Sequence, residues 1–270
     1  MKTIVLCADD YGQNQFISQA IIALLEQDCL SATSCMTTTS EWQNTANSLV
    51  PFKNKVDIGL HFNLTEGQLL TSGMKTMPLS GLIMRAYWRL LDAAKIEREL
   101  NAQLDAFNVA MGQLPDFLDG HQHIHQLPVI RDVLFKVYEQ RLRQKGVYIR
   151  CVYDEQLFMQ MPNMKKLTIQ LLGAGRFKRE LIKRNIPHNT GFSGIYSFKD
   201  ASQYAQIFPQ FLRNISDGGL IMCHPGYMTD VGGDKIVAAR VHEFHYLIGE
   251  QFKRDCSIAQ VRVGRLGMVK

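Results

Sequence analysis

Short apolar runs alternate with longer amphipathic stretches along most of the chain. The apolar runs, which predict strands, lie at 3–9, 30–38, 56–64, 115–125, 147–153, 191–197, 219–226 and 258–266. The stretches with apolar residues at helical spacing lie at about 14–28, 41–50, 88–111, 128–145, 163–173, 200–213 and 235–252. Repeated strand-then-helix units predict an α/β fold with a parallel sheet and right-handed crossovers. About seven or eight units in 270 residues favour a single (β/α) barrel, either distorted or seven-stranded, over an open sheet.

The stretch 65–87 breaks this rhythm. It is too long for an ordinary strand-to-helix loop and predicts a lid or a substrate-binding insertion. No repeat, low-complexity segment or linker divides the chain, so we predict one domain over residues 1–270. Neither a GxGxxG nor a Walker A motif is present, which argues against a nucleotide-binding α/β protein.

Composition and charge narrow the class of protein. With 46% hydrophobic and 20% charged residues, the chain can bury a large core. Its six cysteines form no CxxC pair, which is typical of reduced thiols and predicts a cytoplasmic protein. The net charge of +5 is spread along the chain, and no apolar run reaches membrane-spanning length. We expect no nucleic-acid or membrane partner; the oligomeric state stays open, with a homodimer as one option.

Polar residues gather at the ends of the predicted strands. In a (β/α) barrel the C-terminal ends of all strands open onto one face, where active sites form. Side chains far apart in sequence are therefore expected to meet there. The residues concerned are Asp9, Asp10, His61, His121, His123, His125, Arg150 and His224.

The acidic pair Asp9–Asp10 follows the first strand directly. A strand turning into a loop can aim both carboxylates at one pocket, with one on a cation and the other free as a base. The alternative is that an aspartate caps the next helix. His61 alone would be interpreted as a hydrogen-bonded core residue, but other strand-end groups favour a ligand role.

The block DGHQHIH at 119–125 holds three of the eight histidines. As a strand it would place His121, His123 and His125 on one face; as a helix after His121 it would separate His123. Either geometry pairs His121 with His125. Two imidazoles and a carboxylate form the usual catalytic zinc set, with one position left for water. This set also suits manganese, cobalt or iron, and is unusual for magnesium.

Three further histidines lie near the C-terminus. His224, in MCHPGY, follows a strand and precedes a forced turn, so it is either a general acid or a structural histidine bonded to its own turn. His242 and His245 are three residues apart, so they do not match the HExxH zinc motif. We expect them to be structural residues of a late amphipathic helix.

Five segments, in this order, resemble the YdjC/ChbG-like carbohydrate deacetylase family, whose chitooligosaccharide deacetylases are the nearest type. They are ADDYG (8–12), GLHFNLTEG (59–67), DGHQHIH (119–125), the fifth strand with its arginine, and HPGY (224–227). The resemblance implies a (β/α) barrel akin to the polysaccharide deacetylases. It also implies a hydrolase that removes N-acetyl groups from amino sugars or chito-oligosaccharides by attack of a metal-bound water.

Carried over by position, the family pattern makes Asp10, His61 and His125 the ligands of one divalent metal ion. Asp9 would then be the general base and His224 the general acid. The family is associated with Mg²⁺, whereas the ligand types favour Zn²⁺ or another transition metal.

Three more residues would support the site or touch the substrate. Asp119 would orient a histidine, Arg150 would hold the base carboxylate, and His121 would support the ligands. The family block reads D-S-H-H-H-x-H, and Gly120 and Gln122 depart from it here, which weakens inferences about sugar contacts. Tyr87 and Trp88, at the end of the insertion, would offer aromatic stacking to a sugar ring.

Two rival functions use the same residues. A metal-dependent phosphoesterase or other hydrolase on this barrel would need further cationic groups or a second metal. A non-catalytic carbohydrate-binding protein would have lost the free acid or the terminal histidine, and Asp9 and His224 are both present. The sequence fixes neither the sugar nor its chain length.

Overall fold

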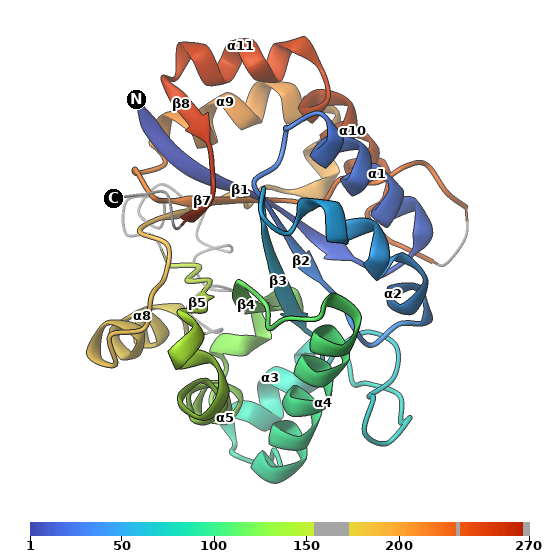
Figure 1. Cartoon of the computed structure of the whole chain (residues 1–270), viewed down its shortest axis with the longest axis vertical. Coiled ribbons are helices and arrows are strands. Elements are labelled where there is room, and N and C mark those ends of the chain that lie inside the picture. Colours follow the sequence, from blue (N-terminus) through green and yellow to red (C-terminus); the bar gives the residue numbers. More distant parts are fainter. Residues whose placement is uncertain (154–172, 231–232, 267–270) are drawn as a thin grey trace.

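The computed structural model describes residues 1–153, 173–230 and 233–266, and Figure 1 shows their arrangement. The strands are β1 (Lys2–Tyr11), β2 (Ala32–Cys35), β3 (Asp57–Phe62), β4 (Phe117–Gly120), β5 (Tyr148–Ile149), β6 (Phe192–Ser193), β7 (Leu220–Cys223) and β8 (Val261–Val263). The α-helices are α1 (Gln15–Glu26), α2 (Ser40–Thr45), α3 (Leu79–Tyr87), α4 (Ala93–Met111), α5 (Ile130–Val137), α8 (Ala174–Lys183), α9 (Tyr204–Asn214), α10 (Val237–Leu247) and α11 (Glu250–Ile258). Tighter or wider helical turns are η1 (Ala46–Phe52), η2 (His121–Gln126), η3 (Tyr138–Leu142), η4 (Arg143–Lys145) and η5 (Phe198–Gln203).

The strands form one parallel sheet in the order β5-β4-β3-β2-β1-β7-β6. The long β1 has a third neighbour, because β8 pairs with its first residues, Lys2–Ile4, before β7 takes over at Val5. In the described part of the chain β5 does not pair with β6, so the barrel stays open on that side. Figure 1 shows the curled sheet at the centre with helices around it. The predicted seven-stranded, distorted (β/α) barrel is confirmed.

The strands form where the apolar runs were found because both faces of the sheet are covered. Every residue of β2, β3, β4 and β7 is buried, as expected for parallel strands under helices on one face and a packed interior on the other. The helices carry the apolar stripe that covers the outer face of the sheet. The ends of the helices are set by local signals. In α4, Asp92 caps the first turn by accepting from Ala94 N and Lys95 N, and Gly112 ends the helix with a left-handed φ of 67°.

All eight predicted strands are present, each shorter than its apolar run except β1. The helix predicted over 88–111 begins only at Ala93, and the one predicted over 235–252 divides at Gly249 into α10 and α11. The helix predicted over 163–173 lies outside the described residues apart from its last position. The basic stretch 176–184, which has apolar residues at helical spacing, forms most of α8. No described helix has both the length and the hydropathy needed to cross a membrane.

Part of the predicted insertion forms regular secondary structure. An antiparallel bridge between Gln68 and Lys75 closes a tight loop, and α3 follows at Leu79. The loop is tied to the barrel by Glu99, a buried carboxylate of α4. Its oxygens accept from the backbone N–H groups of Leu70 and Thr71, both at 3.0 Å. Residues 65–87 are therefore fixed to the rim of the barrel at this point.

Candidate active site

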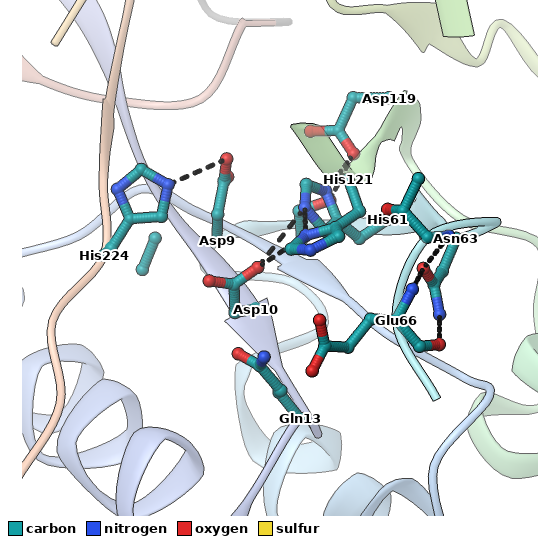
Figure 2. Close-up of polar contacts among 12 residues, drawn as sticks. Asp9, Asp10, Gln13, His61, Asn63, Glu66, Asp119, His121 and His224 are labelled. Carbon is teal, nitrogen blue, oxygen red and sulfur yellow. Dashed lines mark hydrogen bonds and ion pairs between the residues drawn. The ribbon is translucent and has the colours of Figure 1, made fainter. Parts of the chain in front are cut away.

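The C-terminal ends of the strands surround a pocket of about 390 Å³. Its lining residues come from β1, β3, the turn after β4 and the segment after β7, as expected for this end of a (β/α) barrel. Figure 2 shows the polar groups that face one another there. Among them are Asp9, Asp10, His61, His121 and His224, all predicted from the sequence.

Asp10, next to the last residue of β1, has a left-handed backbone conformation. Its φ is 69°, a region that is uncommon outside glycine but that aspartate adopts more often than most residues. This turn separates its carboxylate from that of Asp9. The predicted alternative, that an aspartate caps the next helix, is wrong, because Asn14 caps α1 by accepting from Ile17 N at 3.0 Å. Both carboxylates are thus left to the pocket.

Two imidazoles converge on one oxygen of Asp10. His61 Nε2 lies 3.4 Å and His121 Nδ1 3.2 Å from Asp10 Oδ1, and the two nitrogens are 3.3 Å apart. Asp10 Oδ1 is buried and has no hydrogen-bond partner. An unpartnered buried carboxylate oxygen is costly. Three electron-pair donors that meet at one point describe a cation site better than they describe a hydrogen-bond network.

His61 is oriented by the neighbouring strand. The parallel register places His61 of β3 opposite Asp119 of β4, and His61 Nδ1 donates to Asp119 Oδ1 at 2.7 Å. Ser34 Oγ donates to the same oxygen at 2.6 Å. Burial alone would lower the pKa of His61, but the carboxylates of Asp119 and Asp10 raise it to about 10. The surroundings of this imidazole therefore attract positive charge, and its Nε2 faces Asp10.

The turn η2 decides which histidine of the DGHQHIH block reaches the pocket centre. Gln122 and His123 both adopt left-handed backbone angles, with φ of 55° and 60°. These angles break the strand after Gly120, so the interpretation of the block as one strand face is wrong. His121 points at Asp10, as Figure 2 shows, while His123 lies at the pocket wall with its ring edge-on to Phe192.

Asp9 forms a buried ion pair with Arg150. The two guanidinium Nη atoms lie 2.6 and 2.7 Å from the two carboxylate oxygens, which is a bidentate pair. Arg150 Nη2 also lies 2.7 Å from Asp119 Oδ2, so one cation joins the carboxylates of β1 and β4. Burial would lower the pKa of Arg150, but Asp119 and Asp9 raise it well above its usual value. On the other side of Asp9, His224 Nε2 lies 4.0 Å from Asp9 Oδ2.

Arg240 of α10 completes the contacts of Asp10. Its Nη2 donates to Asp10 Oδ2 at 2.8 Å and to Gln13 Oε1 at 3.1 Å, and its Nε donates to Asp234 Oδ2 at 2.5 Å. Burial would raise the pKa of Asp10, but Arg240 and the two imidazoles hold it well below its usual range. One oxygen of Asp10 is thereby fixed, and the other faces the histidines.

These site features can be compared with known proteins. The sequence profile of the YdjC-like protein family matches residues 3–257, which is most of the chain. The chain belongs to the YdjC-like family. The resemblance found in the sequence is confirmed.

Two curated relatives and one solved structure illustrate the similarity. A carbohydrate deacetylase of Clostridium beijerinckii is 26% identical, and the match covers 92% of each chain. A chitooligosaccharide deacetylase of Yersinia enterocolitica is 23% identical, over 85% of this chain and 84% of the relative. The crystal structure of an Enterococcus faecalis V583 protein superposes with a TM-score of 0.72 at 16% identity, over 98% of each chain, which shows a shared fold.

The ligand set that the family pattern suggested, Asp10, His61 and His125, does not converge in this YdjC-like chain. His125, within η2, is fully buried, and its Nε2 donates to the backbone oxygen of Arg150 at 3.0 Å. Its ring packs edge-on against Phe177, and burial lowers its pKa to about 4. His121, and not His125, lies beside Asp10 and His61 and lines the pocket.

The described residues contain two groups of donor atoms close enough to hold a cation. One is Asp10, His61 and His121; the other is Asp9, His61 and Asp119. In the second group, Arg150 already binds both carboxylates, and His61 presents a donating N–H to Asp119. The first group keeps an unpartnered oxygen and the second nitrogen of His61. It is therefore the better fit for a metal ion.

The family motif GLHFNLTEG also shapes the pocket wall. Asn63 Oδ1 accepts from the backbone N–H groups of Thr65 and Glu66, both at 3.0 Å, and its Nδ2 donates to Glu66 O at 2.7 Å. Asn63 N in turn donates to Gln103 of α4 at 3.0 Å. This turn holds Glu66 at the pocket, beside Gln13 and Asp10 in Figure 2.

Sequence reasoning missed two residues on α10, Arg240 and Glu243, both of which are buried. Their signal was present: charged residues three positions apart occupy the face of the helix that points inward. The histidines of the same helix, His242 and His245, are exposed and do not line the pocket, which agrees with the expectation that they are structural.

Proposed function

We propose that this protein is a metal-dependent hydrolase that removes N-acetyl groups from amino sugars or chito-oligosaccharides. The observation that carries the proposal is the meeting of Asp10, His61 and His121 beside the Asp9–Arg150 pair and His224 in one pocket. Two relatives, a carbohydrate deacetylase and a chitooligosaccharide deacetylase, suggest the substrate class.

The ligands of one divalent ion would be Asp10, His61 and His121. Two imidazole nitrogens with one carboxylate oxygen favour Zn²⁺ or another transition metal over Mg²⁺. When bound, such an ion polarises a carbonyl oxygen and makes water a stronger acid. Asp119 holds the His61 ring through Nδ1, an arrangement that directs Nε2 to a metal.

Asp9 and His224 would divide the proton transfers. Asp9 takes the proton of the water that attacks the acetamide carbon, and the two hydrogen bonds from Arg150 hold this carboxylate in place. His224 gives its proton to the nitrogen of the departing sugar amine as the C–N bond breaks. His224 Nε2 lies 4.0 Å from Asp9 Oδ2, so the return of a proton from Asp9 to His224 after acetate leaves needs one bridging water.

The phosphoesterase alternative fits this pocket less well. A second metal ion would need the carboxylates of Asp9 and Asp119, and Arg150 already binds both. A non-catalytic sugar-binding site would have no use for the free acid and base that remain, Asp9 and His224.

Acetate release from N-acetylated chito-oligomers tests the proposal. The protein is freed of metal with a chelator, reloaded with Zn²⁺, Co²⁺ or Mg²⁺, and assayed beside Asp9→Asn. The exposed His242→Ala variant on α10 serves as a matched control and is expected to match the wild type. We expect acetate with at least one metal and about 10²–10⁴-fold less with Asp9→Asn. No acetate with any metal and oligomer would refute the proposal.

A further inference from the structure

Glu243 is a fully buried carboxylate that faces the back of the His224 turn rather than the pocket itself. Its Oε2 accepts from the backbone N–H of His224 at 2.5 Å, and its Oε1 accepts from Tyr196 Oη at 2.7 Å. Both oxygens are therefore used, one on the segment after β7 and one on the segment after β6. The carboxylate links α10 to two loops at the mouth of the barrel.

The same helix holds the His224 turn at two more points. Gly226 N donates to Arg240 O at 3.2 Å, and Arg240 Nη1 lies 3.5 Å from His224 O. A Cβ atom on Gly226 would come within 3.0 Å of the Arg240 side chain, so the turn lies directly against the helix. Ahead of the turn, the His224 ring packs edge-on to Phe198.

A buried carboxylate needs a reason, because removing its charge from water is costly. Burial raises the pKa of Glu243, while His224, its own hydrogen bonds and Arg240 lower it. The phenol of Tyr204 from α9 and the thiol of Cys223 from β7 also face this region. A packed apolar residue would fill this space at a lower desolvation cost, but it could not accept the N–H of His224.

We propose that Glu243 is a positioning residue for the deacetylation: it fixes the turn that carries His224, so that the imidazole meets the departing amine beside Asp9. The inference rests on the proposed function, since it needs His224 to act as the acid. Glu243 does not line the pocket, and its hydrogen bonds go to His224 and Tyr196 rather than to the three proposed metal ligands. Its effect is therefore expected on one step only, the protonation of the leaving group.

The nature of the leaving group separates this role from general support of the fold. A sugar amine must be protonated to depart, whereas 4-nitrophenolate departs without a proton. For Glu243→Leu we expect kcat on N-acetylated chito-oligomers to fall by at least about tenfold, which is part of the roughly 10²–10⁴-fold that acid catalysis contributes. Hydrolysis of 4-nitrophenyl acetate should change by less than about threefold, as should the Zn²⁺ affinity. Equal losses on both substrates, or no loss on either, would overturn the inference.

Two further variants sharpen the test. Glu243→Gln keeps an oxygen for the His224 N–H and should recover most of the amide activity that Glu243→Leu loses. In a His224→Ala background, Glu243→Leu should lower amide hydrolysis by less than about twofold, because the group that it positions is gone. If Glu243→Leu lowered amide hydrolysis by the same factor in the His224→Ala background as in the wild type, the inference would be overturned. Wild-type protein that releases no acetate would instead remove the proposed function, so the two failures are distinguishable.

Discussion

The exchange of His125 for His121 in the ligand set leads to opposite predictions for two neighbouring histidines. His121 Nδ1 lies 3.2 Å from Asp10 Oδ1 in the pocket, whereas His125 is buried behind it and bonded to the Arg150 backbone. His121→Ala should therefore lose metal binding. His125→Ala should lose stability of the metal-free fold.

The expected magnitudes follow from these contacts. Substitutions in the outer shell of a metal site cost about 10–100-fold in affinity, so loss of the direct ligand His121 should cost at least about 100-fold, or about 2.7 kcal/mol. His125→Ala removes the donor to Arg150 O and a ring packed on Phe177. An unpaired buried carbonyl and a cavity together should cost about 2–4 kcal/mol. Its Zn²⁺ affinity should stay within about tenfold of the wild type, the lower end of outer-shell effects.

Calorimetric titration with Zn²⁺ and urea unfolding of the chelator-treated proteins measure the two quantities separately. Circular dichroism before titration confirms that each variant is folded. The reasoning would be refuted if folded His125→Ala failed to bind Zn²⁺ while His121→Ala bound it normally. If His121→Ala lowered the unfolding free energy of the metal-free protein more than His125→Ala did, the packing argument would be contradicted.

Two further predictions follow from buried charge. Arg150→Met leaves the carboxylates of Asp9 and Asp119 unpaired and should lower the unfolding free energy by about 3–5 kcal/mol at neutral pH, measured by urea denaturation. Arg150 helps to hold the pKa of Asp119 below its usual value, so the wild type loses this stabilisation in acid. The difference should therefore shrink below about pH 4, and a constant difference would contradict the ion-pair argument. Glu99→Ala frees the Leu70 and Thr71 N–H groups, so hydrogen exchange at these two amides should accelerate while exchange in β1 stays unchanged; equal protection in both proteins would refute the anchoring role.

The barrel and the face that carries the candidate site could be predicted from the sequence, because both depend on simple regularities. Apolar runs of strand length survive in the structure as buried parallel strands, and the polar residues after them share one end of the sheet. His61 and Asp119 illustrate this: they are 58 positions apart, yet the register of β3 and β4 makes them direct neighbours.

The choice among the histidines could not be predicted, because it depends on two backbone angles. Positive φ is uncommon for residues other than glycine, and no pattern of hydrophobic and polar residues encodes the turn that Gln122 and His123 make. The roles of Arg240 and Glu243 were missed for a different reason. Apolar periodicity gives no role to a charged residue on the buried face of a helix. Burying a charge without a partner is costly, so a charged residue at such a position indicates that a partner is present.

The charges in contact around the pocket provide a last test of the metal site. The carboxylates of Asp9 and Asp119 share the guanidinium of Arg150, and those of Asp10 and Asp234 share that of Arg240. Four carboxylates against two guanidinium groups leave two negative charges before the imidazoles are counted. The same surplus raises the pKa of His61, and a divalent cation that displaced this proton would balance the charge.

Zn²⁺ should therefore stabilise the fold as well as serve the reaction, since a ligand that binds only the native state raises its stability. At about 100 times its Kd the gain is about 2.7 kcal/mol, which for a domain of this size corresponds to a rise of a few degrees in Tm. Thermal unfolding should show this rise in the wild type and in His242→Ala, and it should be absent from His121→Ala. An equal rise in His121→Ala would mean that Zn²⁺ binds elsewhere, and the Asp10–His61–His121 site would have to be abandoned.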